Sequence, residues 1–390
     1  MRRSRTSLWL GRVLLVLGLS PVTLLGGEVF TRALFPQDVD ARMNIYQPDP
    51  VIGFTYQANA TTYQKGREYN VLFQINSEGL RDREYSTSST ATFRVLLLGD
   101  SFSVSHGLEI GQSLSRQLER ALQAAVDADG LDMFVEVVNA AVGGYSPYNY
   151  WRAYTRWRDV YDPHVVFVGL SPDDYDCSNE DARYLIENGA TLGMATGSED
   201  LSKLGGNVFT RTRKWLSWNS QFYVLMRNFL YYNDVVGGFS RRLVSGNAAQ
   251  ARQLGPFRVP LTEGLWEKTF YYLARLSAEA EQDGVPLIVA PIPLKMEIDE
   301  REYAMVISAA QLSESEIDLE QPLRQIREFC SEREIPVLDA RPVLRLCGLE
   351  TSCYFVYDGH WNSEGVRVSV ESFVRQWREC GLPPWGELRQ

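Results

Sequence analysis

The chain has 390 residues, of which 45% are hydrophobic and 12% aromatic, and its formal net charge is −10 at pH 7. This length can bury a sizeable core in one large or two modest domains, and the composition excludes a disordered chain. The acidic balance, with no long basic run, argues against nucleic-acid binding.

The amino terminus resembles a membrane anchor. Arginines flank an apolar segment at 8–27 that is broken only by Arg12. Counted from Val13, the run is shorter than the about 20 residues of a spanning helix, which suits a signal-peptide core. However, no small-x-small cleavage site follows, and the apolar pattern continues to Phe35. We therefore expect an uncleaved signal anchor at 1–35 with the body of the protein outside the cytoplasm. A cleaved signal peptide and a buried helix are the alternatives.

Residues 36–90 are expected to form a small β-rich unit. The alternation over Asn70–Asn76 predicts a half-buried strand, and Ser77-Glu78-Gly79 then predicts a turn. The polar stretch Tyr85–Thr92 is typical of a linker. The main domain should therefore begin near residue 91.

From 91 to 390 the chain alternates short apolar strands with amphipathic helices. Strands are predicted at Arg94–Leu98, Met133–Val138, His164–Leu170, Val285–Ala290 and Ile335–Leu338, and helices at Ser113–Ala128, Tyr148–Tyr161, Leu265–Gln282, Leu319–Arg333 and Ser363–Glu379. This alternation predicts an α/β fold, doubly wound in three layers around a parallel sheet. The aromatic- and glycine-rich stretch 176–262 breaks the pattern. It is interpreted as an insertion over the carboxyl edge of the sheet, either a lid or glycan-facing wall or an added helical pair.

Two distant motifs carry chemistry. Gly99-Asp100-Ser101 follows the first strand of this domain, where open α/β sheets place their reactive groups. The tripeptide alone is ordinary turn composition. Far downstream, Asp358-Gly359-His360 places a carboxylate two residues before an imidazole. Ser101, His360 and Asp358 have the residue types of a nucleophile, its base and the group that orients the base.

With G-D-S, the N-A-A-V-G-G loop at 139–144 and D-G-H in this order, the chain resembles the SGNH (GDSL) hydrolase superfamily. The resemblance implies a flavodoxin-like fold and a serine esterase whose oxyanion hole uses backbone N–H groups of Ser101 and Gly144. The family usually supplies a third donor from an asparagine. Here the matching residue is Asp173, whose carboxylate would repel an oxyanion unless protonated. The segment I-N-S-E-G-L-R-D at 75–82 and the short D-G-H spacing resemble membrane-anchored, exopolysaccharide-linked members.

The remaining polar candidates are interpreted as structural. His106 is expected on a loop or helix face rather than as a base, and His164 at the start of a buried strand. Asp173 and Asp174 lack a third ligand, so no metal is predicted, and Asp339 is interpreted as a satisfied loop carboxylate.

The cysteines show no metal-ligand spacing. Cys347 and Cys353 could pair in an oxidising compartment, or both could be isolated buried thiols.

Together these features predict a membrane-anchored, extracytoplasmic serine esterase that removes small O-acyl groups, such as acetyl, from a glycan. An O-acetyltransferase acting on a cell-surface or exported polysaccharide is the alternative, which the resemblance to alginate-type acetyltransferases implies. A catalytically inactive glycan-binding module is the third reading. The expected partners are an acylated glycan or other ester, the membrane and polysaccharide-assembly proteins, with no cofactor and no nucleic acid.

Overall fold

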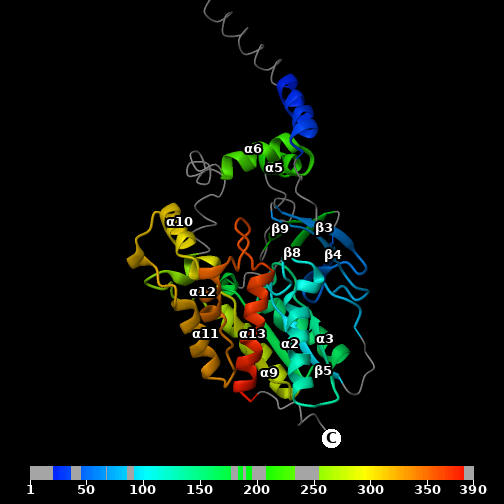
Figure 1. The fold of residues 1–390 in the computed structure, drawn as a ribbon, viewed down its shortest axis with the longest axis vertical. Helices are drawn as coiled ribbons and strands as arrows, with labels where there is room; N and C mark the ends of the chain where they lie inside the picture. The colour runs from blue at the N-terminus through cyan, green and yellow to red at the C-terminus, as the bar shows by residue number, and fades with distance from the viewer. Residues whose placement is uncertain are drawn as a thin grey trace, which may run out of the picture. The chain divides into compact units, whose positions relative to one another are not determined.

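The computed structural model describes residues 21–36, 45–66, 68–85, 92–176, 183–187, 190–195, 208–232 and 254–381. The chain forms two compact units, one from 1–42 and 205–246 and the other from 43–204 and 247–390. The larger unit contains all of the strands labelled in Figure 1.

A four-stranded parallel sheet, in the order β10-β7-β5-β6, forms the centre of the larger unit. Its strands are β5 (Thr92–Leu98), β6 (Phe134–Asn139), β7 (Val165–Leu170) and β10 (Leu287–Pro291). Every residue of β5, β7 and β10 is buried, as continuous apolar runs in a covered parallel sheet require. The predicted α/β fold with a parallel sheet is therefore confirmed.

Helices cover both faces of this sheet (Figure 1). One face packs against α3 (Pro147–Tyr161), α9 (Glu267–Gln282) and α11 (Gln321–Ser331), and the other against α2 (Leu114–Ala128), α12 (Arg341–Glu350) and α13 (Ser363–Glu379). Successive side chains of β5 pack on opposite faces of the sheet, since Leu96 and Leu98 belong to the first core and Val95 and Leu97 to the second. A further helix, α10 (Glu300–Ala310), buries only Ile307.

The predicted strand at Ile335–Leu338 is reduced to a single parallel bridge between Val337 and Val289. The Pro336 carbonyl accepts a hydrogen bond from the Val289 N–H (3.0 Å). Because proline has no N–H of its own, the pairing between the two segments is limited. Short 3-10 turns complete the connections: η1 (Ile110–Gln112), η2 (Pro172–Asp176), η3 (Gly255–Phe257), η4 (Lys295–Glu297) and η5 (Glu314–Glu316).

Three antiparallel hairpins accompany the sheet. They pair β1 (Tyr46–Asp49) with β2 (Gly53–Tyr56), β3 (Thr61–Lys65) with β4 (Asn70–Gln74), and β8 (Arg183–Glu187) with β9 (Ala190–Ala195). The half-buried strand expected over Asn70–Asn76 corresponds to β4, whose Val71 and Phe73 are buried. All three hairpins belong to the larger unit.

The smaller unit contains helical residues 21–34 and the pair α5 (Val208–Asn219) and α6 (Gln221–Tyr232). Glu28 accepts the N–H groups of Gln221 and Phe222 (3.0 and 3.1 Å) and so caps α6. Within the described residues, no helix combines the length and apolar composition that a bilayer crossing needs. Residues 1–20, which hold most of the predicted anchor, lie outside them, so the anchor stays a prediction.

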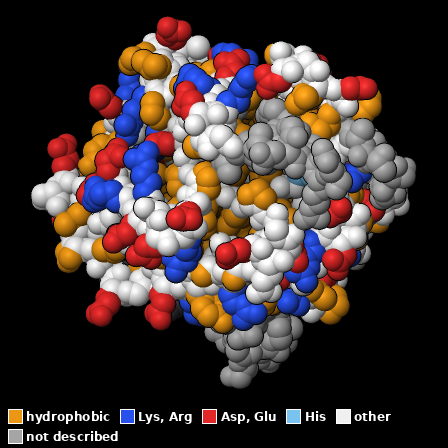
Figure 2. Space-filling model, turned by 90° about the horizontal axis from the view of Figure 1, so that it is seen from below, with side chains coloured by type: hydrophobic (Ala, Val, Ile, Leu, Met, Phe, Trp, Pro, Cys, Tyr) orange, Lys and Arg blue, Asp and Glu red, His pale blue; other side chains and the backbone are white. Residues whose placement is uncertain are grey.

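Charges of both signs are mixed on the surface. On the face seen in Figure 2, acidic and basic side chains alternate among the described residues, with apolar side chains between them. Although the net charge is −10, the acidic side chains therefore do not form one continuous acidic patch on that face.

Candidate active site

Ser101 lies in the turn that follows β5, at the carboxyl edge of the sheet. Asp100 fixes this turn, because one carboxylate oxygen accepts the N–H of Phe102 (2.9 Å) and the other accepts the hydroxyl of Ser171 (3.0 Å). Burial raises the pKa of Asp100. The aspartate before the serine thus ties the ends of β5 and β7 together and leaves the Ser101 side chain half-buried.

The structure brings Ser101, His360 and Asp358 together. Ser101 Oγ lies 2.7 Å from His360 Nε2, although 259 residues separate them. His360 Nδ1 is hydrogen-bonded to Asp358 Oδ1. Phe102 packs on the imidazole, with ring centroids 4.6 Å apart. The three predicted side chains therefore form a continuous hydrogen-bonded series from hydroxyl to carboxylate.

The charged form of Asp358 is strongly favoured. Burial raises the pKa of this carboxyl, but the hydrogen bond and charge of His360, the charge of His106 and the Tyr69 hydroxyl outweigh burial. The pKa of Asp358 consequently lies well below its usual range. An ionised Asp358 keeps the proton of the neutral imidazole on Nδ1, so that Nε2 faces Ser101 as an acceptor.

The second predicted donor loop borders the serine through Gly143. A Cβ placed on Gly143 would lie 3.8 Å from Ser101 Cβ, and the Gly143 N–H donates to the Tyr56 hydroxyl (3.1 Å). Gly144 has φ +87°, and a Cβ placed there would meet Phe54 instead. The oxyanion role of Gly144 stays a prediction, and Gly143 is the glycine whose Cβ position faces Ser101.

The predicted third donor position falls in η2, and the side chain of Asp173 lies outside what the structure describes. Its neighbour Asp174 is buried and accepts the Tyr150 hydroxyl (2.9 Å) and the Ser171 N–H (3.0 Å). Asp174 is thus a structural carboxylate that closes the turn after β7.

Two other candidates have the structural roles predicted for them. His164 accepts the Arg94 N–H at Nδ1 (3.1 Å) and packs against Phe93. Asp339 accepts the N–H of Arg341 (3.0 Å) and a guanidinium N–H of Arg327 (3.1 Å).

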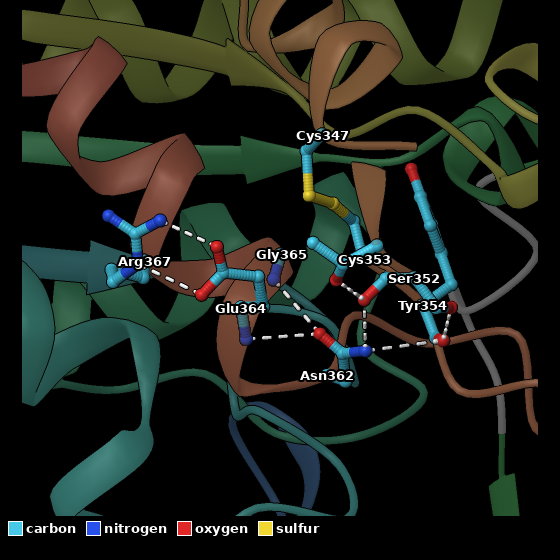
Figure 3. The surroundings of a disulfide bond; sticks show 9 residues. Cys347, Ser352, Cys353, Tyr354, Asn362, Glu364, Gly365 and Arg367 are labelled. Atoms are coloured by element: carbon cyan, nitrogen blue, oxygen red, sulfur yellow. Dashed lines mark hydrogen bonds and ion pairs between the residues drawn. A yellow bond between two sulfur atoms is a disulfide. The ribbon is translucent and has the colours of Figure 1, made fainter. Parts of the chain in front are cut away.

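A disulfide joins Cys347 to Cys353 and fixes one end of the segment that leads to Asp358 (Figure 3). The same end is held by close packing, because a Cβ on Gly365 would lie 2.0 Å from the Cys353 carbonyl oxygen. Only glycine fits at that point of α13. The pairing that the sequence left open is therefore made in the structure.

Asn362 fixes the other end of this segment. Its Oδ1 accepts the N–H groups of Glu364 and Gly365 (3.0 Å each) and so caps α13. Its Nδ2 donates to the carbonyls of Ser352 (2.6 Å) and Tyr354 (3.4 Å), as the dashed lines of Figure 3 show. Both ends of the loop that bears Asp358 and His360 are therefore held in place.

Three residues to which the sequence assigned no catalytic part lie against this site. His106 stacks on His360 with ring centroids 4.7 Å apart, Tyr69 donates to Asp358, and Gln64 contacts His106. No motif or spacing points to Tyr69 or Gln64. His106 lies in the turn after Ser101, and the sequence analysis expected it on a loop or helix face.

His106, Asp358 and His360 also present ligand atoms within 4.8 Å of one another, which is the composition of a metal site. In this structure the same atoms are used in hydrogen bonds, since both nitrogens of His360 and Nε2 of His106 have partners within the site. The arrangement is thus complete as an acid–base system built from protein groups.

Comparison with known proteins agrees with this geometry. Residues 259–384 match the family model described as "SGNH hydrolase-like domain, acetyltransferase AlgX". The match includes Asp358 and His360 and confirms the predicted resemblance to SGNH hydrolases. It also agrees with the predicted enzyme class, a hydrolase that acts on ester bonds.

Several solved structures are similar to this chain. A catalytic mutant of the acetylxylan esterase Axe2 from Geobacillus stearothermophilus is 12% identical, covering 77% of this chain and 98% of that one, with a TM-score of 0.37. A G-D-S-L family lipolytic protein from Veillonella parvula is 10% identical, covering 73% and 97%, with a TM-score of 0.35. TesA is 13% identical, covering 74% and 99%, with a TM-score of 0.37. No curated protein matches the chain.

Proposed function

Because residues 259–384 match an SGNH hydrolase-like domain, we propose that this chain is an SGNH-type serine esterase that removes small O-acyl groups, acetyl above all, from a glycan. One observation carries the proposal. Ser101 Oγ lies 2.7 Å from His360 Nε2, and Asp358 is hydrogen-bonded to the other ring nitrogen.

The chemistry follows from this order of groups. Ser101 Oγ attacks the acyl carbonyl carbon while His360 Nε2 takes the hydroxyl proton, and the ionised Asp358 stabilises the resulting imidazolium. The imidazolium then protonates the departing sugar oxygen, which leaves the acyl group on Ser101. Water, deprotonated by the same His360, releases the acid and restores the serine.

Negative charge on the carbonyl oxygen needs fixed donors. The backbone N–H groups of Ser101 and Gly144 are the proposed donors, and one such donor contributes about 3–4 kcal/mol to lowering the barrier. Burial raises the pKa of Tyr56 well above its usual value, so this hydroxyl stays protonated beside Gly143.

O-acetyl transfer is the second candidate, and the family match favours it because that model describes an acetyltransferase. The acyl-serine formed on Ser101 is common to both reactions. In transfer, a sugar hydroxyl takes the place of water, and His360 removes its proton in the same way. The identity of the acceptor separates the two reactions.

The test uses purified full-length protein, an activated acetyl ester and a fluorophosphonate probe. We expect the probe to label Ser101, and we expect Ser101→Ala and His360→Ala each to lower turnover by at least about a thousandfold while the melting temperature stays near wild type. Ser308→Ala, on an exposed position of α10, is the matched control and should leave turnover unchanged.

Retained turnover in either active-site variant would refute the assignment, and a chain that neither labels nor turns over would be the inactive binding module. Product analysis with an acetylated oligosaccharide decides between the two reactions. Release of acetate without an acceptor supports hydrolysis. Acetyl appearing only on an added sugar acceptor would replace the esterase with the transferase.

We also propose that the chain acts outside the cytoplasm and is anchored through 1–35, near polysaccharide-assembly proteins. The Cys347–Cys353 disulfide supports an oxidising compartment. The basic and then apolar composition of the first residues supports the anchor. Thiol alkylation after cell fractionation tests this. A protein recovered from the cytoplasm with both thiols reduced would contradict it.

A further inference from the structure

The turn between β3 and β4 lies against the loop that carries Asp358 and His360. The Glu68 carboxylate accepts the backbone N–H groups of Val356 and Tyr357, each at 2.7 Å. A carboxylate that accepts two consecutive amides holds both peptide units in one orientation. Glu68 therefore fixes the backbone just before Asp358.

Tyr69 holds the side chain of Asp358. Its hydroxyl donates to Asp358 Oδ2 at 2.7 Å, while Oδ1 serves His360. The Tyr69 ring packs against Phe355, with centroids 5.1 Å apart, so the phenol itself is held in place. Both oxygens of the carboxylate thus have assigned partners, and the carboxylate plane is set by Tyr69 as much as by the imidazole.

The hydrogen bonds behind Tyr69 run in one direction. Gln64 Oε1 accepts the Gly107 N–H (2.8 Å), which orients its amide so that Nε2 donates to His106 Nδ1 (2.6 Å), the nearer of the two ring nitrogens. His106 therefore carries its proton on Nε2, which donates to the Tyr69 oxygen (2.9 Å). The Tyr69 proton is left to point at Asp358.

The charges around His106 keep this direction. Burial first, and then the nearby charges of His360 and Arg81, lower the pKa of His106 to about 4, although the charge of Asp358 opposes them. His106 stays neutral near pH 7, so Nδ1 remains an acceptor for Gln64. The donor sequence from Gln64 to Asp358 is therefore stable over the working range of an esterase.

The loop itself needs such support. Gly359, between Asp358 and His360, has φ +84°, and a Cβ placed there would meet nothing within 4 Å. A glycine in open space contributes no side-chain contact that would hold the backbone between the two functional groups. Contacts from outside the loop must then fix the relation of the carboxylate to the imidazole.

We propose that the β3–β4 turn is a positioning element of the active site, in which Glu68 holds the backbone before Asp358 and Tyr69 holds its carboxylate, so that His360 presents Nε2 to Ser101. This inference rests on the proposed function. Neither residue touches the reacting atoms, so both are positioning residues.

The test compares Tyr69→Phe with Tyr63→Phe in the full-length protein. Tyr63 lies on β3 of the same hairpin, but its side chain is exposed, so it is a matched control for losing one phenol hydroxyl. With an activated acetyl ester, we expect Tyr69→Phe to lower kcat about tenfold, with KM within about twofold of wild type. The acid limb of the kcat/KM profile should move to higher pH, because an Asp358 carboxylate without the Tyr69 donor interacts more strongly with the protonated His360 imidazole. Tyr63→Phe should match wild type in kcat, in KM and in the pH profile.

Glu68→Gln is an independent second test, because the amide keeps one acceptor oxygen for the two N–H groups and places an NH2 donor against the other. We expect a fall in kcat and in the rate of fluorophosphonate labelling, each about fivefold, with a melting temperature near wild type. Wild-type kcat and pH profile in both Tyr69→Phe and Glu68→Gln would overturn the inference.

Ser101→Ala separates this failure from failure of the proposed function. If Ser101→Ala is inactive while both turn variants behave as wild type, only the positioning role is wrong. If Ser101→Ala is as active as wild type, or wild type neither labels nor turns over, the proposed function fails and the positioning role fails with it.

Discussion

Arg81 is buried against the loop that follows β5, and replacing its side chain should destabilise that loop. Its side chain is 1% exposed, and its guanidinium donates to the carbonyls of Val104, Ser105 (3.1 Å) and Leu108. The guanidinium also lies over the Phe73 ring, 4.3 Å from the centroid. One side chain from the amino-terminal part of the chain thus ties down most of the turn that presents the nucleophile.

Arg81→Met keeps much of the volume and removes the donors. Ser105 retains a hydrogen bond from the Leu108 N–H (3.2 Å), so the carbonyls of Val104 and Leu108 bear most of the loss. A buried acceptor left without a partner costs about 1–3 kcal/mol. Part of this is offset because the charge no longer has to be buried, a penalty visible in the pKa of Arg81, which burial lowers to about 10. We expect a net destabilisation of about 3 kcal/mol.

The assay is urea unfolding followed by tryptophan fluorescence, combined with fluorophosphonate labelling in native buffer. Arg367→Met is the matched control, since its side chain is 46% exposed and pairs with Glu364 and Glu371 at the surface of α13, where such pairs contribute less than about 1 kcal/mol. Arg81→Met should unfold at lower urea and label more slowly than either wild type or the control. Equal stability of the two arginine variants would refute this account of the loop.

Two further outcomes test other parts of the molecule. Burial raises the pKa of Glu297 to about 8, whereas in the unfolded state this carboxyl has its ordinary pKa of 4.5. The folded state therefore keeps a proton that the unfolded state has lost, and stability should fall as the pH rises from 4.5 to about 8. In Glu297→Gln, whose amide oxygen still accepts the Leu294 N–H, melting temperatures between pH 5 and 8 should lose that slope, and parallel curves for the two proteins would contradict the assignment. The double change Cys347→Ser and Cys353→Ser should lower the free energy of unfolding by about 2 kcal/mol for so short a loop, and reductant should do the same to wild type. A melting temperature unmoved by both treatments would show that the disulfide adds no stability.

The sheet was predictable because its strands are buried on both faces. The run Arg94–Leu98 lies within β5, and helix α13 starts where Asn362 marks its cap. The helices α10 and α12 were not predicted. They are short, and α12 contains both Pro342 and Gly348, which weaken a helical pattern in sequence.

The residues of the active site also differ in whether the sequence reveals them. Ser101, Asp358 and His360 could be identified because acyl chemistry restricts the residue types and the two motifs are distinctive. Tyr69 could not, since its contact with Asp358 joins residues 289 apart and depends on how a hairpin packs against a distant loop. A tyrosine in a turn has no sequence feature that reveals a carboxylate at the other end of the chain.

The strand order β10-β7-β5-β6 also limits how the molecule can be cut. A polypeptide beginning at residue 259 would contain the whole matched segment, yet of the four central strands it would keep β10 alone. Such a fragment would lack the nucleophile and would expose the edge of β10 that normally pairs with β7. Expression of the recognisable part by itself should therefore yield aggregated material, and any screen for activity has to start from the longer polypeptide.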